Sequence, residues 1–96
     1  MSAYLILDLS IKNFGRFSEY IEMIPAFIKK HGGHYVVQGV VPETIEGEWH
    51  PERVVIIEFP SKVAAKSFLS DPDAQPLFEL RHQVTNSRLI LAEGCL

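Results

Sequence analysis

Short apolar segments bounded by turn residues predict four β-strands along the chain. Segments of this kind form strands when they are rich in β-branched and aromatic residues and are too short for a helix. The strands are expected over residues 4–10, 34–41, 53–59 and 87–93. Residues 53–59, with the sequence RVVIIEF, form the least ambiguous of them, and Pro60 ends it.

Apolar residues at three- and four-residue spacing predict helices between these strands. Asn13 offers an N-cap to the first helix, and Gly32-Gly33 supplies the left-handed geometry that ends it. Pro25 lies inside this helix, so a kink or a split is expected there. A second helix is expected over residues 61–71 and a shorter one over 75–85, because Asp71-Pro72-Asp73 interrupts the pattern. The stripe of the first helix comprises Phe14, Phe17, Tyr20, Ile21, Ile24, Phe27 and Ile28.

The order of these elements predicts one α+β domain over residues 1–96 with a ferredoxin-like βαββαβ fold. Right-handed crossovers then place the helices on one face of a four-stranded antiparallel sheet. Alternate strand residues share a face, so one apolar set is expected to pack against the helices. This set comprises Leu5, Leu7, Leu9, Tyr35, Val37, Val55, Ile57, Phe59, Leu89 and Leu91.

The opposite face of the sheet is half apolar and half polar by the same alternation. It is expected to carry Tyr4, Ile6, Asp8, His34, Val36, Gln38, Val40, Val54, Ile56, Glu58, Arg88, Ile90 and Ala92. A face this apolar needs a cover, and a second copy of the sheet is the simplest one, so a homodimer is expected. Trp49, in the loop between the second and third strands, is either a lid over a pocket or a contact in this dimer. The enrichment of aromatic residues at interfaces favours the contact.

Composition and charge narrow the functional classes. The net charge of −3 argues against nucleic-acid binding, and no apolar stretch is long enough to cross a membrane. Residues 1–10 have no basic start like that of a signal peptide, and the single cysteine, Cys95, suits a reducing compartment. A cytoplasmic location is therefore expected. The four histidines are not spaced as metal ligands, and Cys95 has no base nearby in sequence, so neither a metal site nor a thiol nucleophile is expected.

Glu58 is the first candidate for catalysis, because it lies in the middle of an apolar strand on the side predicted to face the partner. Desolvation there would raise the pKa of its carboxyl and suit it to general acid or base chemistry. The alternative is a structural ion pair with Arg88 or His34. That alternative is the more common role for a buried carboxylate.

Asp8, His34, Gln38 and Tyr4 share the same predicted face and could line a small polar cleft. A histidine in such a cleft can transfer protons near neutral pH. Because His34 lies at the start of its strand, it could equally be solvated.

Arg53 and Arg81 are candidate ligand-binding residues, because a guanidinium group binds carboxylates through two hydrogen bonds. For Arg53 the structural alternatives are capping of a sheet edge or an ion pair with Glu52 or Glu46. For Arg81 the alternative is an anchor to Glu79 or Asp73.

Residues 32–81 resemble the DUF1330 family of small uncharacterised proteins, and the preceding helix with Pro25 fits it too. The most specific features are Gly32-Gly33, Glu46-Gly47, the block 51–61 and Arg81, which falls where the family places an arginine. The resemblance implies a dimeric α+β barrel, the superfamily that includes muconolactone isomerase-like and antibiotic-biosynthesis monooxygenase-like proteins. Two departures are the valine after Gly39, where the family tends to have a second glycine, and the segment 71–74, where it tends to have a tyrosine.

This resemblance implies a small enzyme that needs no cofactor and is isomerase-like or monooxygenase-like. Its substrate would be a small aromatic or carboxylated metabolite. The alternative is a non-catalytic homodimer with a ligand-binding or structural role, which the missing tyrosine and the incomplete catalytic set favour. Fold-level analogy does not decide between them, so whether the protein is an enzyme stays open.

Overall fold

Four strands form one antiparallel sheet in the order β2-β3-β1-β4. The computed structural model describes residues 1–95. The strands are β1 (Ala3–Ile11), β2 (His34–Val40), β3 (Arg53–Phe59) and β4 (Thr85–Glu93). The central strands β1 and β3 pair along their length, from Ala3 opposite Phe59 to Leu9 opposite Arg53. This topology confirms the predicted ferredoxin-like fold.

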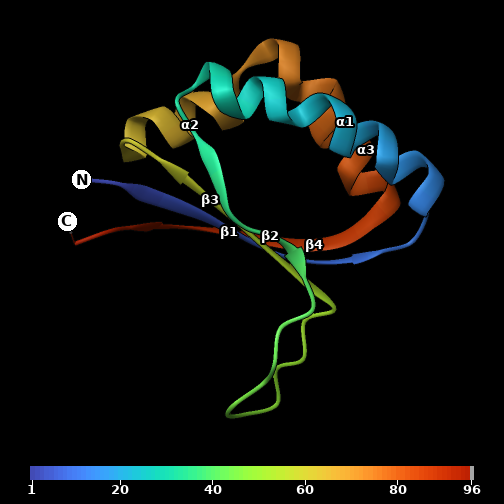
Figure 1. Ribbon diagram of the computed structural model, residues 1–96. Coiled ribbons are helices and arrows are strands. Elements are labelled where there is room, and N and C mark those ends of the chain that lie inside the picture. Colours follow the sequence, from blue (N-terminus) through green and yellow to red (C-terminus); the bar gives the residue numbers. More distant parts are fainter. Residues whose placement is uncertain (96) are drawn as a thin grey trace.

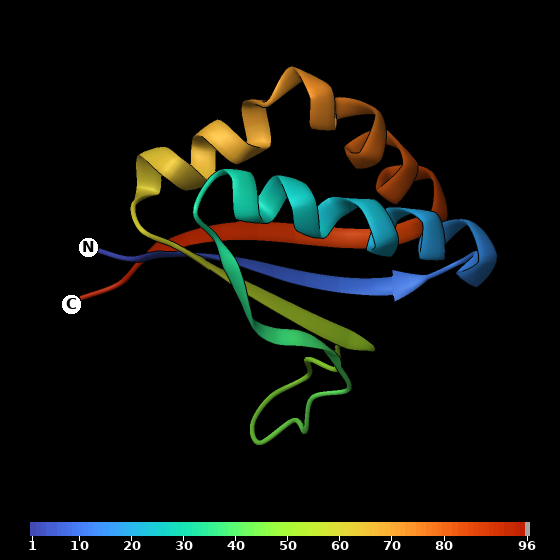
Figure 2. The same cartoon turned by 45° about the horizontal axis from the view of Figure 1, so that its top comes forward.

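All helices lie on one face of the sheet, and the other face is open (Figures 1 and 2). They are α1 (Phe14–Lys30), α2 (Lys62–Ser70), the short 3₁₀ turn η1 (Pro72–Ala74) and α3 (Gln75–Val84). Asn13 caps α1, because its side-chain oxygen accepts a hydrogen bond of 3.0 Å from the amide of Arg16. Gly32 follows α1 with a φ of 78°, the left-handed conformation expected at this helix end.

Helix α1 runs unbroken through Pro25, so the expected split of this helix is wrong. Proline has no amide hydrogen, and the carbonyl of Ile21 therefore lacks its usual donor one turn earlier. Pro25 and Ile21 both lie on the exposed side of α1, where water can bind that carbonyl. The helix therefore continues past Pro25 without this one hydrogen bond.

The core lies between the helices and the sheet, as the alternation in β1 and β3 predicts. Leu5, Leu7 and Leu9 of β1 are buried, as are Val55, Ile57 and Phe59 of β3. Phe68 of α2 contacts Phe59 and Phe78, each at 5.3 Å between ring centroids. The aromatic cluster therefore ties α2 and α3 to the sheet.

Strand β2 departs from the predicted alternation, because its register against β3 shifts twice. The first shift falls between Tyr35 and Val37, and the second between Gln38 and Val40. Val37 consequently pairs with Ile56 on the open face, and Gln38 pairs with Val55 on the helix side. The predicted faces of Val37 and Gln38 are therefore exchanged, since each extra residue in a β-bulge reverses the faces of those that follow.

The connection between β2 and β3, residues 41–52, projects beyond the sheet as a long loop (Figure 1). Within residues 1–95, no helix is both long enough and apolar enough to cross a membrane.

Candidate functional site

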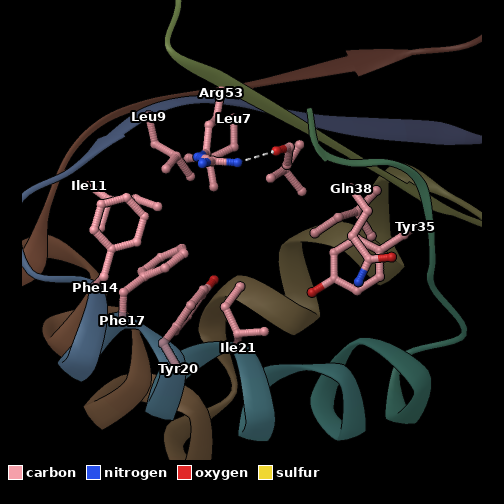
Figure 3. Close-up of a pocket in the computed structure, with 13 residues that line it drawn as sticks. Leu7, Leu9, Ile11, Phe14, Phe17, Tyr20, Ile21, Tyr35, Gln38 and Arg53 are labelled. Atoms are coloured by element: carbon pink, nitrogen blue, oxygen red, sulfur yellow. Dashed lines mark hydrogen bonds between the residues drawn. The ribbon is translucent and has the colours of Figure 1, made fainter. Parts of the chain in front are cut away.

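A cavity of about 370 Å³ lies between the first half of α1 and the sheet. Its size falls within the usual range of small-molecule sites. The apolar walls come from both layers, with aromatic rings on the helix side (Figure 3). They comprise Leu7, Leu9, Ile11, Val55 and Ile57 from the sheet and Phe14, Phe17 and Ile21 from α1. Such walls suit a flat apolar ligand.

Arg53 places a guanidinium group in this apolar cavity (Figure 3). Its side chain points to the helix side of β3, in register with buried Leu9. One of its nitrogens, Nη1, donates a hydrogen bond of 3.0 Å to the carbonyl of Gly39, and the group lies 6.0 Å from the ring centre of Phe14. None of the carboxylates in residues 1–95 forms an ion pair with Arg53, so the alternative pairs with Glu52 and Glu46 are absent there.

Two tyrosines add hydroxyl groups to the walls (Figure 3). Burial raises the pKa of Tyr20 to about 12, although the nearby charge of Arg81 acts in the opposite direction. Burial likewise raises the pKa of Tyr35. Both phenols are protonated at neutral pH, as ordinary phenols are, and can donate hydrogen bonds.

Gln38 also lines this cavity, because the first β-bulge turns it to the helix side. The sequence places it instead with Asp8 and His34 on the open face, and that placement is wrong. The amide can both donate and accept, so it complements the cationic group of Arg53. Of the seven predicted site residues, Arg53 and Gln38 are the two that this cavity brings together.

Glu58, His34 and Tyr4 form a row across the open face of the sheet. Glu58 accepts a hydrogen bond of 3.0 Å from the Tyr4 hydroxyl and lies 3.0 Å from Nε2 of His34. Hydrogen bonds from the side chains of Ser2, Tyr4 and His34 outweigh desolvation and lower the pKa of Glu58. The expected rise of this pKa is therefore wrong, since three partners stabilise the carboxylate form. The pair of Glu58 with His34 is the structural alternative considered for this residue.

Asp8 belongs to a different part of the same face. It accepts hydrogen bonds from Arg88 at 3.0 Å and from the indole nitrogen of Trp49 at 3.2 Å. An apolar row that includes Ile6 and Ile56 lies between Asp8 and the Tyr4–Glu58 pair, so Asp8 and His34 do not share one cleft. Arg88 therefore pairs with Asp8 and not with Glu58.

A family model described as "Domain of unknown function (DUF1330)" matches residues 2–95. The chain belongs to the DUF1330 family. A search of curated proteins finds no match to this DUF1330 sequence.

Several solved structures share the fold of this DUF1330 protein. A protein of unknown function from Rhodopseudomonas palustris matches with a TM-score of 0.78 and 20% identity, over 99% of this chain and 83% of that one. SnoaB, a cofactor-independent oxygenase from Streptomyces nogalater, matches with a TM-score of 0.71 and 14% identity, over 99% and 94%. A dimeric ferredoxin-like protein of unknown function from Jannaschia sp. CCS1 matches at 0.66 and 12%, over 98% and 100%. At sequence identities this low, these matches show a similar fold and do not show a shared function.

Arg81, which the resemblance to DUF1330 singles out, is buried in the helical layer and does not line the cavity. Its side chain is 5% exposed and lies 5.8 Å from the ring centre of Phe78. Its Nε atom has no hydrogen-bond partner in the described chain, and neither Glu79 nor Asp73 forms an ion pair with it there. Arg81 therefore makes no direct contact with the cavity, although its charge lies near Tyr20.

Sequence reasoning missed Tyr20 and Tyr35 as site residues. Tyr20 belongs to the apolar stripe of α1, and that pattern does not separate a residue that fills the core from one that lines a cavity. A phenol within such a stripe is the available signal, because a buried hydroxyl needs a partner. Within residues 1–95, no group of three or more His, Cys, Asp or Glu side chains is arranged to hold a metal ion.

Proposed function

We propose that this DUF1330 protein binds a small aromatic carboxylate in the cavity between α1 and the sheet. The observation that carries this proposal is Arg53, a cation in a mostly apolar cavity without a carboxylate partner in the described chain. Arg53 is partly buried, and removing a charge from water is costly unless an opposite charge or several hydrogen bonds compensate it. A ligand carboxylate supplies that compensation through two parallel hydrogen bonds.

The rest of the cavity fits the apolar part of such a ligand. Phe14 and Phe17 offer ring faces on the helix side, and Leu9 and Val55 cover the sheet side. Burial of a flat aromatic body between these layers supplies most of the binding free energy, and Arg53 fixes its orientation.

A second candidate is turnover of the bound ligand without a cofactor. The fold shared with the oxygenase SnoaB favours it, as does the presence of two protonated phenols in the cavity. Glu58, His34 and Asp8, the residues predicted for catalysis, lie on the opposite face of the sheet, and a role for them in the reaction stays a prediction. Incubation of a bound ligand with the protein in air, followed by mass spectrometry, separates the two candidates: a carrier returns the ligand unchanged.

The binding proposal is tested by calorimetric titration with 2-naphthoate and with the neutral 2-naphthylmethanol. Arg53→Met keeps the apolar part of the side chain and removes its charge. We expect this variant to bind 2-naphthoate roughly tenfold to a hundredfold more weakly, since a hydrogen-bonded charge contributes about 1.5–3 kcal/mol. Binding of the neutral alcohol is expected to change little.

The matched control is Arg16→Met, which removes an exposed arginine outside the cavity that hydrogen-bonds to Gln83. This variant is expected to bind both compounds like the wild type. Equal affinity of Arg53→Met and wild type for 2-naphthoate would overturn the proposal, as would a wild-type protein that does not bind aromatic carboxylates.

A further inference from the structure

Tyr20 carries a hydroxyl group that the protein itself leaves without a partner. The residue is 7% exposed, and its ring stacks on Phe17 with 5.6 Å between ring centroids. None of the hydrogen bonds formed within residues 1–95 involves this hydroxyl, although buried phenols usually have a partner. Because the Tyr20 ring is buried and stacked on Phe17, the direction of its hydroxyl is fixed.

The hydroxyl points into the cavity from the wall opposite Arg53. Figure 3 shows Tyr20 on α1, with its oxygen directed between the two layers, and Arg53 on the sheet above it. Phe14 and Phe17 lie on one side of the space between them, and Tyr35 and Gln38 lie on the other. A ligand held by Arg53 through its carboxylate therefore extends its ring toward Tyr20.

At neutral pH this hydroxyl is a neutral donor, as phenols are, and burial raises the pKa of Tyr20 further, to about 12. A neutral phenol in an apolar wall favours a ligand oxygen as its partner, since an apolar ligand edge there would leave a buried donor unsatisfied. Sites built to hydrogen-bond a ligand oxygen discriminate strongly against analogues that lack it.

We propose that Tyr20 is the specificity-determining residue of the cavity and that its ligands are aromatic carboxylates with a second oxygen, a hydroxyl or a carbonyl, on the ring remote from the carboxylate. This proposal rests on the function proposed above and narrows its ligand class. Arg53 binds the anionic end, and Tyr20 recognises the oxygen at the other end. The apolar walls between them accept the rings.

The test compares 2-naphthoate with its isomers that carry a hydroxyl on the second ring, by calorimetric titration. We expect the wild type to prefer at least one hydroxylated isomer by roughly tenfold, the value of one hydrogen bond of about 1.4 kcal/mol. Tyr20→Phe is expected to abolish that preference and to bind 2-naphthoate itself at least as tightly as the wild type does, since no donor is then left unsatisfied against its apolar edge. Tyr4→Phe removes a phenol hydroxyl from the opposite face of the sheet and is expected to keep the preference.

Thermal melting of the free variants supplies a second readout. A hydroxyl without a partner contributes nothing to the fold, so Tyr20→Phe is expected to melt at the wild-type temperature or above it. A clearly lower melting temperature would mean that the hydroxyl has a structural partner and would overturn the inference.

The outcomes separate this inference from the proposed function. If 2-naphthoate binds through Arg53 but Tyr20→Phe keeps the preference, or if no isomer is preferred, the inference is wrong and the proposed function stands. If neither naphthoate nor its isomers bind the wild type, the proposed function fails and takes the inference with it.

Discussion

At the scale of single residues, Asp71 connects two parts of the helical layer through one carboxylate. One of its oxygens, Oδ2, lies 2.8 Å from Nζ of Lys30 and 2.8 Å from Nε2 of His31, both at the end of α1. The other accepts from the amide of Asp73 at 3.0 Å, within the turn that separates α2 from α3. The residue is 4% exposed, so these contacts replace its hydration.

We predict that Asp71 makes the stability of the protein fall with the pH under acidic conditions. Hydrogen bonds from Lys30 and His31 lower the pKa of Asp71 from 3.8 to about 2 in the folded state. A carboxyl group whose pKa is lower in the folded than in the unfolded protein stabilises the fold at pH values above its unfolded pKa. This stabilisation is lost as the pH falls through the folded pKa. The wild type should therefore lose this contribution between about pH 4 and pH 2.

Urea unfolding of Asp71→Asn and of the wild type, measured from neutral pH down through this range, checks the prediction. The variant should be less stable than the wild type at pH 7, and the difference should shrink toward pH 2. Asp73→Asn is the control, because Asp73 lies in the same turn, is exposed and forms no ion pair within the described chain. A constant difference between Asp71→Asn and wild type across the range would contradict the prediction.

At the scale of elements, the sequence predicted the positions of β1, β2 and β3, but the alternation of apolar residues gave the correct faces only for β1 and β3. Leu5, Leu7 and Leu9 reach the core as expected, because a regular ladder keeps the two-residue period. In β2 the two β-bulges reverse the faces of Val37 and Gln38. Gly39 next to Gln38 is a signal for a bulge, since glycine inside a strand often marks one. The sequence alone gives no position for the first bulge, which has no glycine.

The same limit explains how much of the candidate site the sequence predicts. Arg53 opens an unambiguous strand, and a charge at such a position is visible in the sequence. The pair of Glu58 with His34 was one of two alternatives that the predicted sheet offered. The partners of Asp71 come from helix ends distant in sequence, and no local pattern encodes them. The direction of a pKa shift depends on those partners, so it cannot be predicted before they are known.

We predict that Gly39 supports the cavity through its backbone. It has a φ of 70° with open space around its α-carbon, so a side chain there costs backbone strain and causes no clash. Gly39→Val should lower the free energy of unfolding by about 1–2 kcal/mol. It should also weaken binding of 2-naphthoate several-fold, because the Gly39 carbonyl that holds Arg53 moves when the bulge relaxes.

Gly47→Val is the matched control for this variant. Gly47 has a φ of 85° and equally open surroundings, but it lies in the loop 41–52, outside the cavity walls. This variant should lose similar stability and keep wild-type affinity for 2-naphthoate. Equal affinities of the two valine variants would show that the Gly39 bulge does not support the cavity.

At the scale of the whole molecule, the helices cover one face of the sheet and leave the other open (Figure 2). The open face has an apolar middle, where Ile6 pairs with Ile56 and Ile90, and Ile90 is 61% exposed. Its polar groups are already paired, Glu58 with Tyr4 and His34 and Asp8 with Arg88 and Trp49. Paired groups lose less on burial than isolated charges, so this face can enter an interface.

We therefore predict a homodimer that joins two copies through their open faces, because the exposed apolar middle of this face needs a cover. Ile90→Lys tests it, because a two-fold interface would bury the new charge in both copies. Sedimentation at micromolar concentration should show a dimer for the wild type and a dissociation constant at least tenfold higher for Ile90→Lys.

The control is Val63→Lys, on the exposed side of α2. It changes a valine that is 74% exposed and should leave the dimer intact. A wild type that sediments as a monomer would refute the proposed assembly, whereas dissociation by both lysine variants would place the interface elsewhere.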